Sequence, residues 1–249
     1  MRDTTNDDLF ELSNAPLSPL DLPAEEEIPL PDPEEMLILL QSDLPMERMQ
    51  AARVFCELED ARAIPRLIQL LNDDCPLVRV SAAYALGRNK SKVAIEPLIQ
   101  QFHQDWNGYV RKGVVWALGT CHDSDALDCL INALTYDIPA VRLWAASALG
   151  QLGDIKAIAA VTQALNEDKM SAVRANCAWA LGKLLMCLLQ SADNQDDLYH
   201  DAVDALIHAL NDDDLSVVAD ARTTLRRVAD PRGLKVLDRI EIEQGYCEF

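Results

Sequence analysis

The chain has little positive charge and few aromatic residues. Lysine and arginine number 22 against 41 aspartates and glutamates in 249 residues, so the formal net charge is −19, and 5% of the residues are aromatic. Nucleic acids and anionic membranes select basic surfaces. The charge balance therefore predicts a protein partner and no nucleic acid, although a local basic stripe remains compatible with it.

The sequence also lacks recognisable targeting, membrane and metal-binding segments. The first residues, MRDTTNDDLF, have neither the basic nor the apolar region of a secretory signal, and there is no run of 18 apolar residues. The seven cysteines form no CxxC and no zinc-ligand spacing, which is typical of reduced thiols. We expect a cytoplasmic protein with no membrane insertion and no metal site.

No motif of a nucleophile elbow, P-loop or dinucleotide site is present, so the sequence names no catalytic residue. Cys56, Cys129 and Cys177 fall in predicted helices, and we interpret them as buried structural thiols. Cys247 lies in the tail GYCEF and is predicted to be exposed. That leaves a reactive thiol open, although one ligand does not make a metal site.

Residues 1–33 differ from the rest of the chain. Six of the twelve prolines lie there, and residues 1–35 carry eleven acids against one base. Proline and like charge oppose a packed core, so we predict a disordered, acidic, proline-rich arm over 1–33. The alternative is a segment that folds back over the first repeat. At the other end, 244–249 are predicted to form an exposed tail.

An internal repeat dominates the remainder. The motif V-R-x-x-x-x-x-A-L-G occurs four times, with its arginines 32, 31 and 32 residues apart. A degenerate copy around Arg48 precedes these four, and another follows a 12-residue insertion, with Val218 in the arginine's place. A period between 20 and 50 residues indicates a solenoid or an array.

Each repeat is predicted to contain two helices. Between the motif copies lie apolar segments with helical i, i+3, i+4, i+7 spacing, such as AIPRLIQLLND from Ala63. We name these the A helices and the motif helices the B helices. The predicted pairs cover about 34–58, 61–89, 92–121, 124–152, 155–192 and 197–228, and a terminal helix begins near Pro231.

This pattern resembles the HEAT repeat, and more narrowly the HEAT-like repeats of the phycobilisome bilin-lyase-related proteins of cyanobacteria. The VRxxAAxALG blocks and the acidic loops before them carry the resemblance, over roughly 34–240. It implies an all-α, right-handed superhelical solenoid over 34–243, of about six HEAT-like pairs plus a terminal helix. It also implies that the A helices line the convex face and the B helices the concave face.

The loop between the A and B helices is acidic in each repeat and lies five or six residues before the motif arginine. This spacing predicts a ladder in which aspartates pair with the arginine of their own or the next repeat. Its predicted members are Arg79, Arg111, Arg142, Arg174, Asp74 and Asp137. An aspartate in this loop is also placed to cap the N-terminus of the B helix, and the motif glycine is expected near the helix C-terminus.

One variable motif position carries large aromatic residues. In successive copies it holds Tyr84, Trp116, Ser147 and Trp179, and Trp144 lies one helical turn before Ser147 on the same face. Arg53 fills this position in the first repeat. We predict that Arg53, Tyr84, Trp116, Trp144 and Trp179 form a partner-binding stripe on the concave face. The alternative is that the rings only pack between repeats.

The sequence therefore predicts a non-catalytic protein-binding scaffold or adaptor without a cofactor. The family resemblance implies an alternative, a subunit or helper of a bilin lyase that holds a linear tetrapyrrole and acts on a phycobiliprotein. Such a chain would work beside a second HEAT-like chain. A weaker alternative, suggested by Cys247, is a partner of iron–sulfur cluster assembly proteins.

Overall fold

The computed structural model describes residues 31–191, 196–243 and 245. The chain divides into Met1–Pro31 and Asp32–Phe249, and the described fold belongs to the second unit. Most of the predicted arm therefore lies outside the described residues. Its last three positions, 31–33, do not: Asp32 caps the first helix and Pro33 begins it. The tail 244–249, including Cys247, also lies outside, except for Gly245.

The described residues form thirteen α-helices and no strand. The A helices are α1 (Pro33–Leu39), α3 (Ile64–Leu70), α5 (Ile95–Gln104), α7 (Leu127–Tyr136), α9 (Ile158–Glu167) and α11 (Asp196–His208). The B helices are α2 (Pro45–Val54), α4 (Pro76–Arg88), α6 (Gly108–Cys121), α8 (Pro139–Leu152), α10 (Ser171–Gln190) and α12 (Leu215–Val228), and α13 (Pro231–Glu243) ends the stack. The six predicted pairs and the terminal helix are confirmed.

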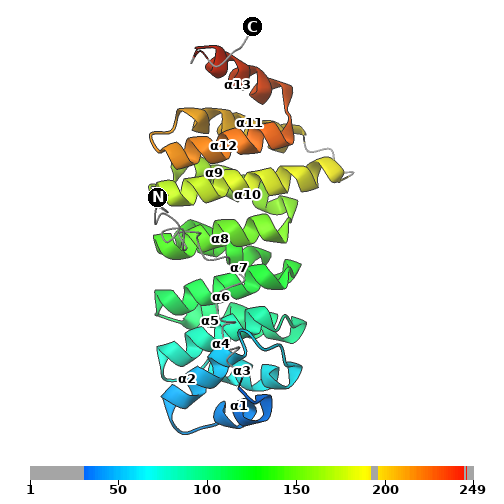
Figure 1. The fold of residues 1–249 in the computed structure, drawn as a ribbon. Helices are drawn as coiled ribbons and strands as arrows, with labels where there is room; N and C mark the ends of the chain where they lie inside the picture. The colour runs from blue at the N-terminus through cyan, green and yellow to red at the C-terminus, as the bar shows by residue number, and fades with distance from the viewer. Residues whose placement is uncertain (1–30, 192–195, 244, 246–249) are drawn as a thin grey trace, which may run out of the picture. The chain divides into compact units, whose positions relative to one another are not determined.

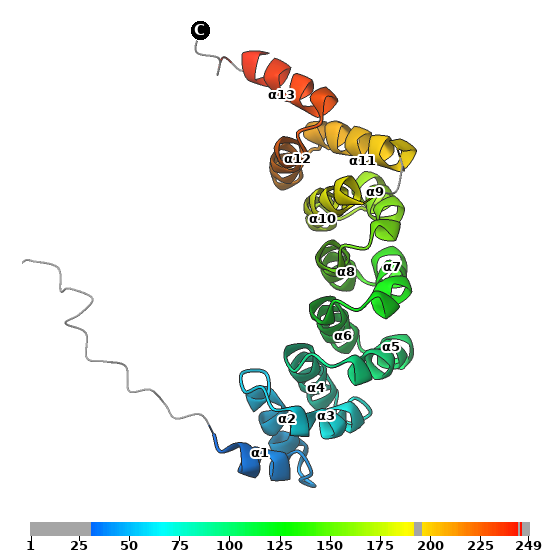
Figure 2. The same ribbon diagram turned by 90° about the vertical axis from the view of Figure 1, so that its right-hand side faces the viewer.

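The helices of this unit stack in two layers (Figure 1). Each B helix packs against the next one, in the order α2, α4, α6, α8, α10 and α12. In Figure 2 the B helices lie on the inner side of the curved stack and the A helices on its outer side. The arrangement implied by the family resemblance, with the B helices concave, is confirmed.

The core is a continuous strip between the two layers. Motif residues such as Val110, Ala117 and Leu118 are fully buried, as are Leu98 and Leu130 of the A helices. Alanines at the motif centre let neighbouring B helices approach closely, while leucines from the A layer fill the space between layers. Each repeat thus buries its apolar side against its neighbours, as a solenoid requires.

Helix starts follow local sequence signals. Four A helices are preceded by a single 3-10 turn, and before three of these turns Asp60, Asp123 and Asp154 accept a hydrogen bond from the N–H two residues later. This contact satisfies a donor that has no partner inside the helix. Proline occupies the first turn of α2, α4 and α8, where its missing N–H removes no helical bond.

The motif glycines of α4, α6 and α8 lie near the C-termini of these helices, as expected, although inside the helices and not at their ends; Gly182 lies well before the end of α10. A β-carbon on Gly87 would lie 2.7 Å from the Trp116 ring, and one on Gly119 would lie 2.6 Å from the Cβ of Ala148. The left-handed ends are instead His122, Gly153 and Ala229. The glycines are needed because the next B helix passes directly against them.

Helix α10 is the longest, with 20 residues against 14 in α8. By length and composition alone it could cross a membrane, the single described helix with that property, and 56% of its most apolar window is buried. It packs against α8, α9 and α12. Its apolar surface is therefore that of a core helix in the stack.

Candidate functional site

Five arginines on successive B helices join the acidic loops into a ladder. Each guanidinium donates from Nε and Nη2 to both carboxylate oxygens of an aspartate in the following loop, a charge-assisted bidentate pair. The pairs are Arg48–Asp73, Arg79–Asp105, Arg111–Asp137, Arg142–Asp168 and Arg174–Asp212, with closest contacts of 2.6–2.7 Å. The contacts link each repeat to the next and begin one repeat earlier than predicted.

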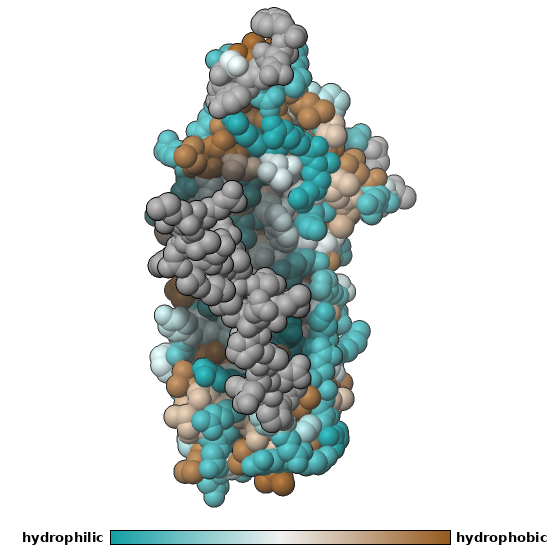
Figure 3. Space-filling model, viewed as in Figure 1, coloured by the Kyte–Doolittle hydropathy of each residue, from teal (hydrophilic) through white to brown (hydrophobic). Residues whose placement is uncertain are grey.

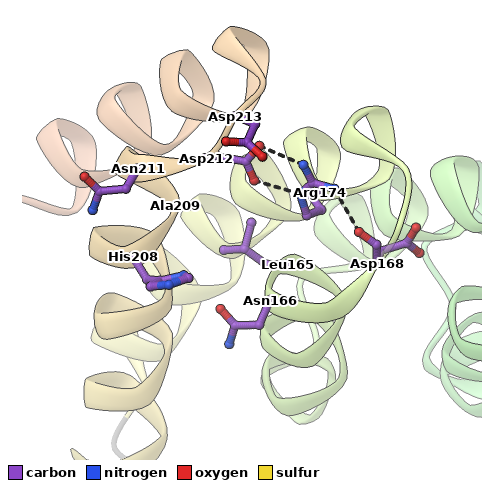
Figure 4. Close-up of a pocket in the computed structure, with 9 residues that line it drawn as sticks. All are labelled: Leu165, Asn166, Asp168, Arg174, His208, Ala209, Asn211, Asp212 and Asp213. Atoms are coloured by element: carbon purple, nitrogen blue, oxygen red, sulfur yellow. Dashed lines mark hydrogen bonds and ion pairs between the residues drawn. The ribbon is translucent and has the colours of Figure 1, made fainter.

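Each arginine also reaches back to its own loop. Nη1 of Arg174 donates to the carbonyl of Asp168 at 2.9 Å, as Figure 4 shows beside the two bonds to Asp212. The same atom of Arg111 donates to the carbonyl of Asp105 at 2.9 Å. One side chain therefore bridges two consecutive loops in every rung.

One sequence expectation about these loops is wrong, and a second holds only in part. The carboxylate of Asp74 is not a rung, because Asp73 holds Arg48, and Asp74 contributes only its carbonyl to Arg79 at 3.2 Å. The Asp73 carboxylate is turned toward the rung by the N–H of Cys75. Nor does a loop aspartate cap every B helix: Asp214 caps α12 by accepting a hydrogen bond from the Ser216 N–H, but the caps of α4, α8 and α10 have no side-chain bond.

The rungs differ in burial. The Arg79 and Asp105 side chains are 9% and 1% exposed, whereas the other four arginines are 15–19% exposed. Burial raises the pKa of Asp105, but hydrogen bonds from Arg79, the Asn107 N–H and Gln101 outweigh it and hold that pKa below its ordinary value. The same balance of burial and hydrogen bonding lowers the pKa of Asp73 and Asp168.

The depressed pKa values predict acid-induced loss of stability. A carboxyl whose pKa is lower in the folded chain stabilises the fold above its unfolded pKa of about 3.9, and that contribution is lost as the pH falls through the folded pKa. We expect the ladder's contribution to the melting temperature to stay constant from pH 7 to 5 and to fall below about pH 4. Thermal melts of the wild type and Asp105→Asn at several pH values measure this. If the melting temperature of both fell by the same amount between about pH 5 and pH 3, the expectation would be contradicted.

The four predicted stripe aromatics lie on consecutive B helices and are half-buried, whereas Arg53 on α2 is exposed. The rings of Tyr84 and Trp116 are 5.1 Å apart between centroids and tilted by 54°. Trp116 lies against Gly87 of the preceding repeat, and Trp179 lies against Gly150. The rings therefore contribute to packing between repeats and also present part of their surface on the concave side.

A basic side chain lies near each of the four rings. Of these cations, the sequence predicted only Arg53 as part of the stripe. Nζ of Lys112 lies 5.9 Å from the centroid of the Trp144 ring, and Nζ of Lys183 lies 5.8 Å from that of Trp179. These are distances at which a cation is attracted to a ring face. The Lys112 contact crosses from α6 to α8, so the motif itself gave no signal for it.

Two arginines lie at the other end of the stripe. Arg53 and Arg88 line a groove of about 440 Å³ together with Tyr84, Trp116 and Glu57, whose carboxylate forms no ion pair with either arginine. Among the residues that the structure describes, none of the four cations is paired with a carboxylate. We refer to Arg53, Tyr84, Arg88, Lys112, Trp116, Trp144, Trp179 and Lys183 as the cationic aromatic face.

Burial keeps three of the described thiols protonated, Cys56, Cys129 and Cys177, although Cys56 is half-buried and not, as predicted, fully buried. Cys129 and Cys177 are buried, and burial raises the pKa of Cys129 to about 12 and that of Cys56 to about 11, so these thiols stay protonated at neutral pH. In the part of the chain that is described, no group of three or more His, Cys, Asp or Glu residues is arranged to hold a metal ion. The exposure predicted for Cys247 falls outside that part.

Comparisons with known proteins agree with the helical repeat. Deoxyhypusine hydroxylase of Saccharomyces cerevisiae is 31% identical over 103 residues, which are 41% of this chain and 32% of that enzyme, so the match spans about a third of the relative. An engineered protein of known structure is 24% identical with a TM-score of 0.59, over 79% of this chain and 98% of that one.

A second solved structure is that of the complex of CpcE and CpcF of phycocyanin lyase from a Nostoc species. It is 24% identical with a TM-score of 0.56, over 88% of this chain and 96% of that one. At this identity the likeness concerns the fold. The family model described as HEAT repeats matches residues 33–100 and 95–182, more than half of the sequence. Together with the observed helix pairs, this match places the chain in the HEAT-repeat family.

Proposed function

We propose that this chain is a non-catalytic protein-binding scaffold that holds an acidic, partly apolar segment of a partner on the cationic aromatic face. One observation carries the proposal: four cations without carboxylate partners lie beside four rings on the inner face of a chain whose net charge is −19. Trp, Tyr and Arg often dominate binding energy at protein interfaces. The charge separation favours a partner segment that brings carboxylates to this face.

The small number of cations on this face also supports the prediction that the chain binds no nucleic acid. Proteins that bind DNA through its backbone commonly make on the order of 6–10 phosphate contacts. The cationic aromatic face supplies four cations within a strongly acidic chain. A carboxylate-bearing segment therefore fits the face better than a phosphate backbone.

Binding of a fluorescent twelve-residue peptide that alternates glutamate and leucine tests this proposal. Lys183→Gln removes a charge beside Trp179 on the exposed side of the ring, and we expect it to weaken binding about threefold or more, because a rim charge chiefly guides association. Trp179→Ala should weaken binding more, by about tenfold or more. Trp106→Ala is the matched control, since Trp106 is an exposed tryptophan that does not belong to this face.

Melting curves of the same variants separate binding from folding. If Trp179 were only a packing residue, Trp179→Ala would lower stability while the folded fraction bound the peptide normally. Equal affinity in the wild type and in Lys183→Gln and Trp179→Ala would exclude the face as the binding surface. Tight, strongly salt-dependent binding of a single-stranded DNA would instead show a nucleic-acid face.

A second candidate function is that of a subunit or helper of a bilin lyase that acts on phycobiliproteins. The fold likeness to the CpcE–CpcF complex supports it. So does the pairing of flat rings with cations, which suits a conjugated tetrapyrrole that carries carboxylates. Titration with a linear tetrapyrrole should then shift its visible absorbance, and Trp116→Ala should reduce the shift. An unchanged spectrum would leave the scaffold as the proposal.

A further inference from the structure

Large exposed apolar side chains are concentrated at one edge of the stack. Thirteen such residues occur in the described part of the chain, and nine of them lie where the A–B loops meet the first turns of the B helices. These nine are Leu44, Met46, Leu77, Trp106, Tyr109, Tyr136, Ile138, Met170 and Leu215. We name this edge the loop rim. Single exposed apolar residues are ordinary, but an aligned row over six repeats marks an interaction surface.

The centre of the loop rim is aromatic. Trp106, Tyr109 and Tyr136 are 78%, 75% and 80% exposed, and Ile138 lies beside them. A hollow of about 310 Å³ opens at this point, lined in part by Phe102, Tyr136 and Ile138. Tryptophan and tyrosine side chains are typical of the energetic centre of a protein interface.

Two contacts fix the neighbouring loops from which the aromatic side chains project. Arg111 joins the two loops, with Nη1 at 2.9 Å from the Asp105 carbonyl and Nη2 at 2.6 Å from the Asp137 carboxylate. A β-carbon on Gly108 would lie 2.5 Å from Cδ1 of Ile138, so that isoleucine rests on the glycine backbone. Such a surface loses little conformational freedom on binding, because the ladder has already ordered it.

Acidic residues flank the aromatic centre. The A–B loops 41–44, 72–75, 105–107, 137–138, 168–170 and 212–214 contain nine aspartates and one lysine, and the rung arginines neutralise five of the aspartates. The four without an arginine are Asp43 and Asp74 on one side, and Asp213 and Asp214 on the other. Hydrogen bonds from Ser171 and Ser216 hold the pKa of Asp214 at about 2, so it stays charged at neutral pH.

We propose that the loop rim is a second docking surface, separate from the cationic aromatic face, for an extended partner segment that alternates basic and apolar side chains. Apolar side chains of the segment lie against Trp106, Tyr109 and Tyr136, and its basic side chains meet the flanking aspartates. Attraction between the basic side chains of the segment and the aspartates at the two ends of the loop rim fixes the position of the segment along the rim. A second copy of this chain fits less well, because its net charge of −19 would face the acidic flanks.

The length of the segment follows from the spacing of the helices. Neighbouring packed helices lie about 8–10 Å apart, so four repeats cover roughly 30–40 Å. An extended chain spans about 3.3–3.6 Å per residue, and about twelve residues therefore reach from one acidic flank across the aromatic centre. This length defines the probe for the test.

The test titrates the full chain into a fluorescent twelve-residue peptide that alternates lysine and leucine. A lysine–serine peptide of the same length keeps the charge without the apolar side chains, and we expect it to bind about tenfold more weakly. Trp106→Ala and Tyr136→Ala should each weaken lysine–leucine binding about fivefold or more. Asp74→Asn should weaken it about twofold and reduce its dependence on salt.

Matched controls keep the result interpretable. The substituted rings are mostly exposed, so both variants should keep the wild-type melting temperature. Trp179→Ala, on the other face, should leave lysine–leucine binding unchanged. Trp106→Ala should leave binding of the glutamate–leucine peptide unchanged. Failure at one face is therefore distinguishable from failure at the other.

Three results would overturn the proposal. Equal binding of the lysine–serine and lysine–leucine peptides would show that charge alone attracts them. Unchanged affinity in Tyr136→Ala would remove the aromatic centre from the interface. A dimer in sedimentation experiments that Trp106→Ala dissociates would make the loop rim an interface between two copies of this chain.

Discussion

Arg79→Ala is expected to lower the free energy of unfolding by about 3–5 kcal/mol, the usual effect of removing one partner from a buried ion pair. The Asp105 carboxylate would stay in its 1% exposed position without the two guanidinium bonds that now compensate for its burial. The carbonyls of Asp73 and Asp74 would lose a donor as well. The loss is therefore larger than the net contribution of the pair itself.

Urea unfolding of Arg79→Ala, Asp105→Ala and the double variant measures this effect. The double variant should be more stable than the sum of the two single losses implies, because neither partner remains buried alone. Arg79→Lys should fall between wild type and alanine, since lysine keeps the charge but not the bidentate geometry. Arg62→Ala is the control: this side chain is 57% exposed and pairs with Glu34 and Asp60 near the surface, so its removal should change the melting temperature less than Arg79→Ala.

An unfolding free energy of Arg79→Ala within about 1 kcal/mol of the wild type would contradict the ladder as a stabilising element. The four rungs whose arginines are 15–19% exposed should lose less stability on substitution than Arg79. A loss in Arg111→Ala equal to that in Arg79→Ala would mean that burial of the pair does not control the cost.

Gly119→Ala and Gly113→Ala are expected to change stability in opposite directions, although both lie in α6. Alanine favours a helix over glycine by about 0.8–1.0 kcal/mol. At Gly113 the nearest atom to a new β-carbon is a Tyr84 ring carbon at 3.5 Å, an ordinary contact, so the substitution should stabilise the chain. At Gly119 the new β-carbon would lie 2.6 Å from Cβ and 3.0 Å from Cα of Ala148, so the two helices must move apart.

Overpacking of this kind costs about 1–3 kcal/mol, which exceeds the gain in helix propensity. Urea unfolding of both variants measures these opposite changes in the free energy of unfolding, provided that the dependence of that free energy on urea concentration stays the same as in the wild type. Stabilisation by Gly119→Ala would show that α6 and α8 can separate without loss. Destabilisation by Gly113→Ala would show a constraint at that site that the static contacts do not reveal.

Features that repeat with the period of the chain could be predicted from the sequence. The helix pairs and the arginines of the ladder recur in register, so several copies carry the same signal. The period also separates Asp73 from Asp74, a signal that spacing to Arg79 alone missed: Asp73 precedes Asp105 by 32 residues, and Asp105 precedes Asp137 by 32, whereas Asp74 is out of register. In the structure the N–H of Cys75 orients the Asp73 carboxylate.

Features outside the repeated positions were not found from the sequence. Lys112 and Lys183 stand next to motif residues, but their relation to Trp144 and Trp179 depends on how far each helix is rotated. Trp106 lies in a loop and Tyr136 ends α7, at positions without a common motif, and only the stacking of the repeats brings them to one edge. Which surface residues meet on one face of a solenoid therefore depends on how the repeats align with one another. A short stretch of sequence does not show that alignment.

The pair between Arg174 and Asp212 shows at which edge of the stack extra residues can be inserted. Its partners are 38 residues apart, whereas the three preceding rungs span 26, yet the contact is still 2.7 Å. The additional residues enter after the rung arginine, on the side where a B helix connects to the next A helix. The stack can therefore acquire inserted sequence, or even a grafted domain, at that edge while the arginine-held edge keeps its spacing.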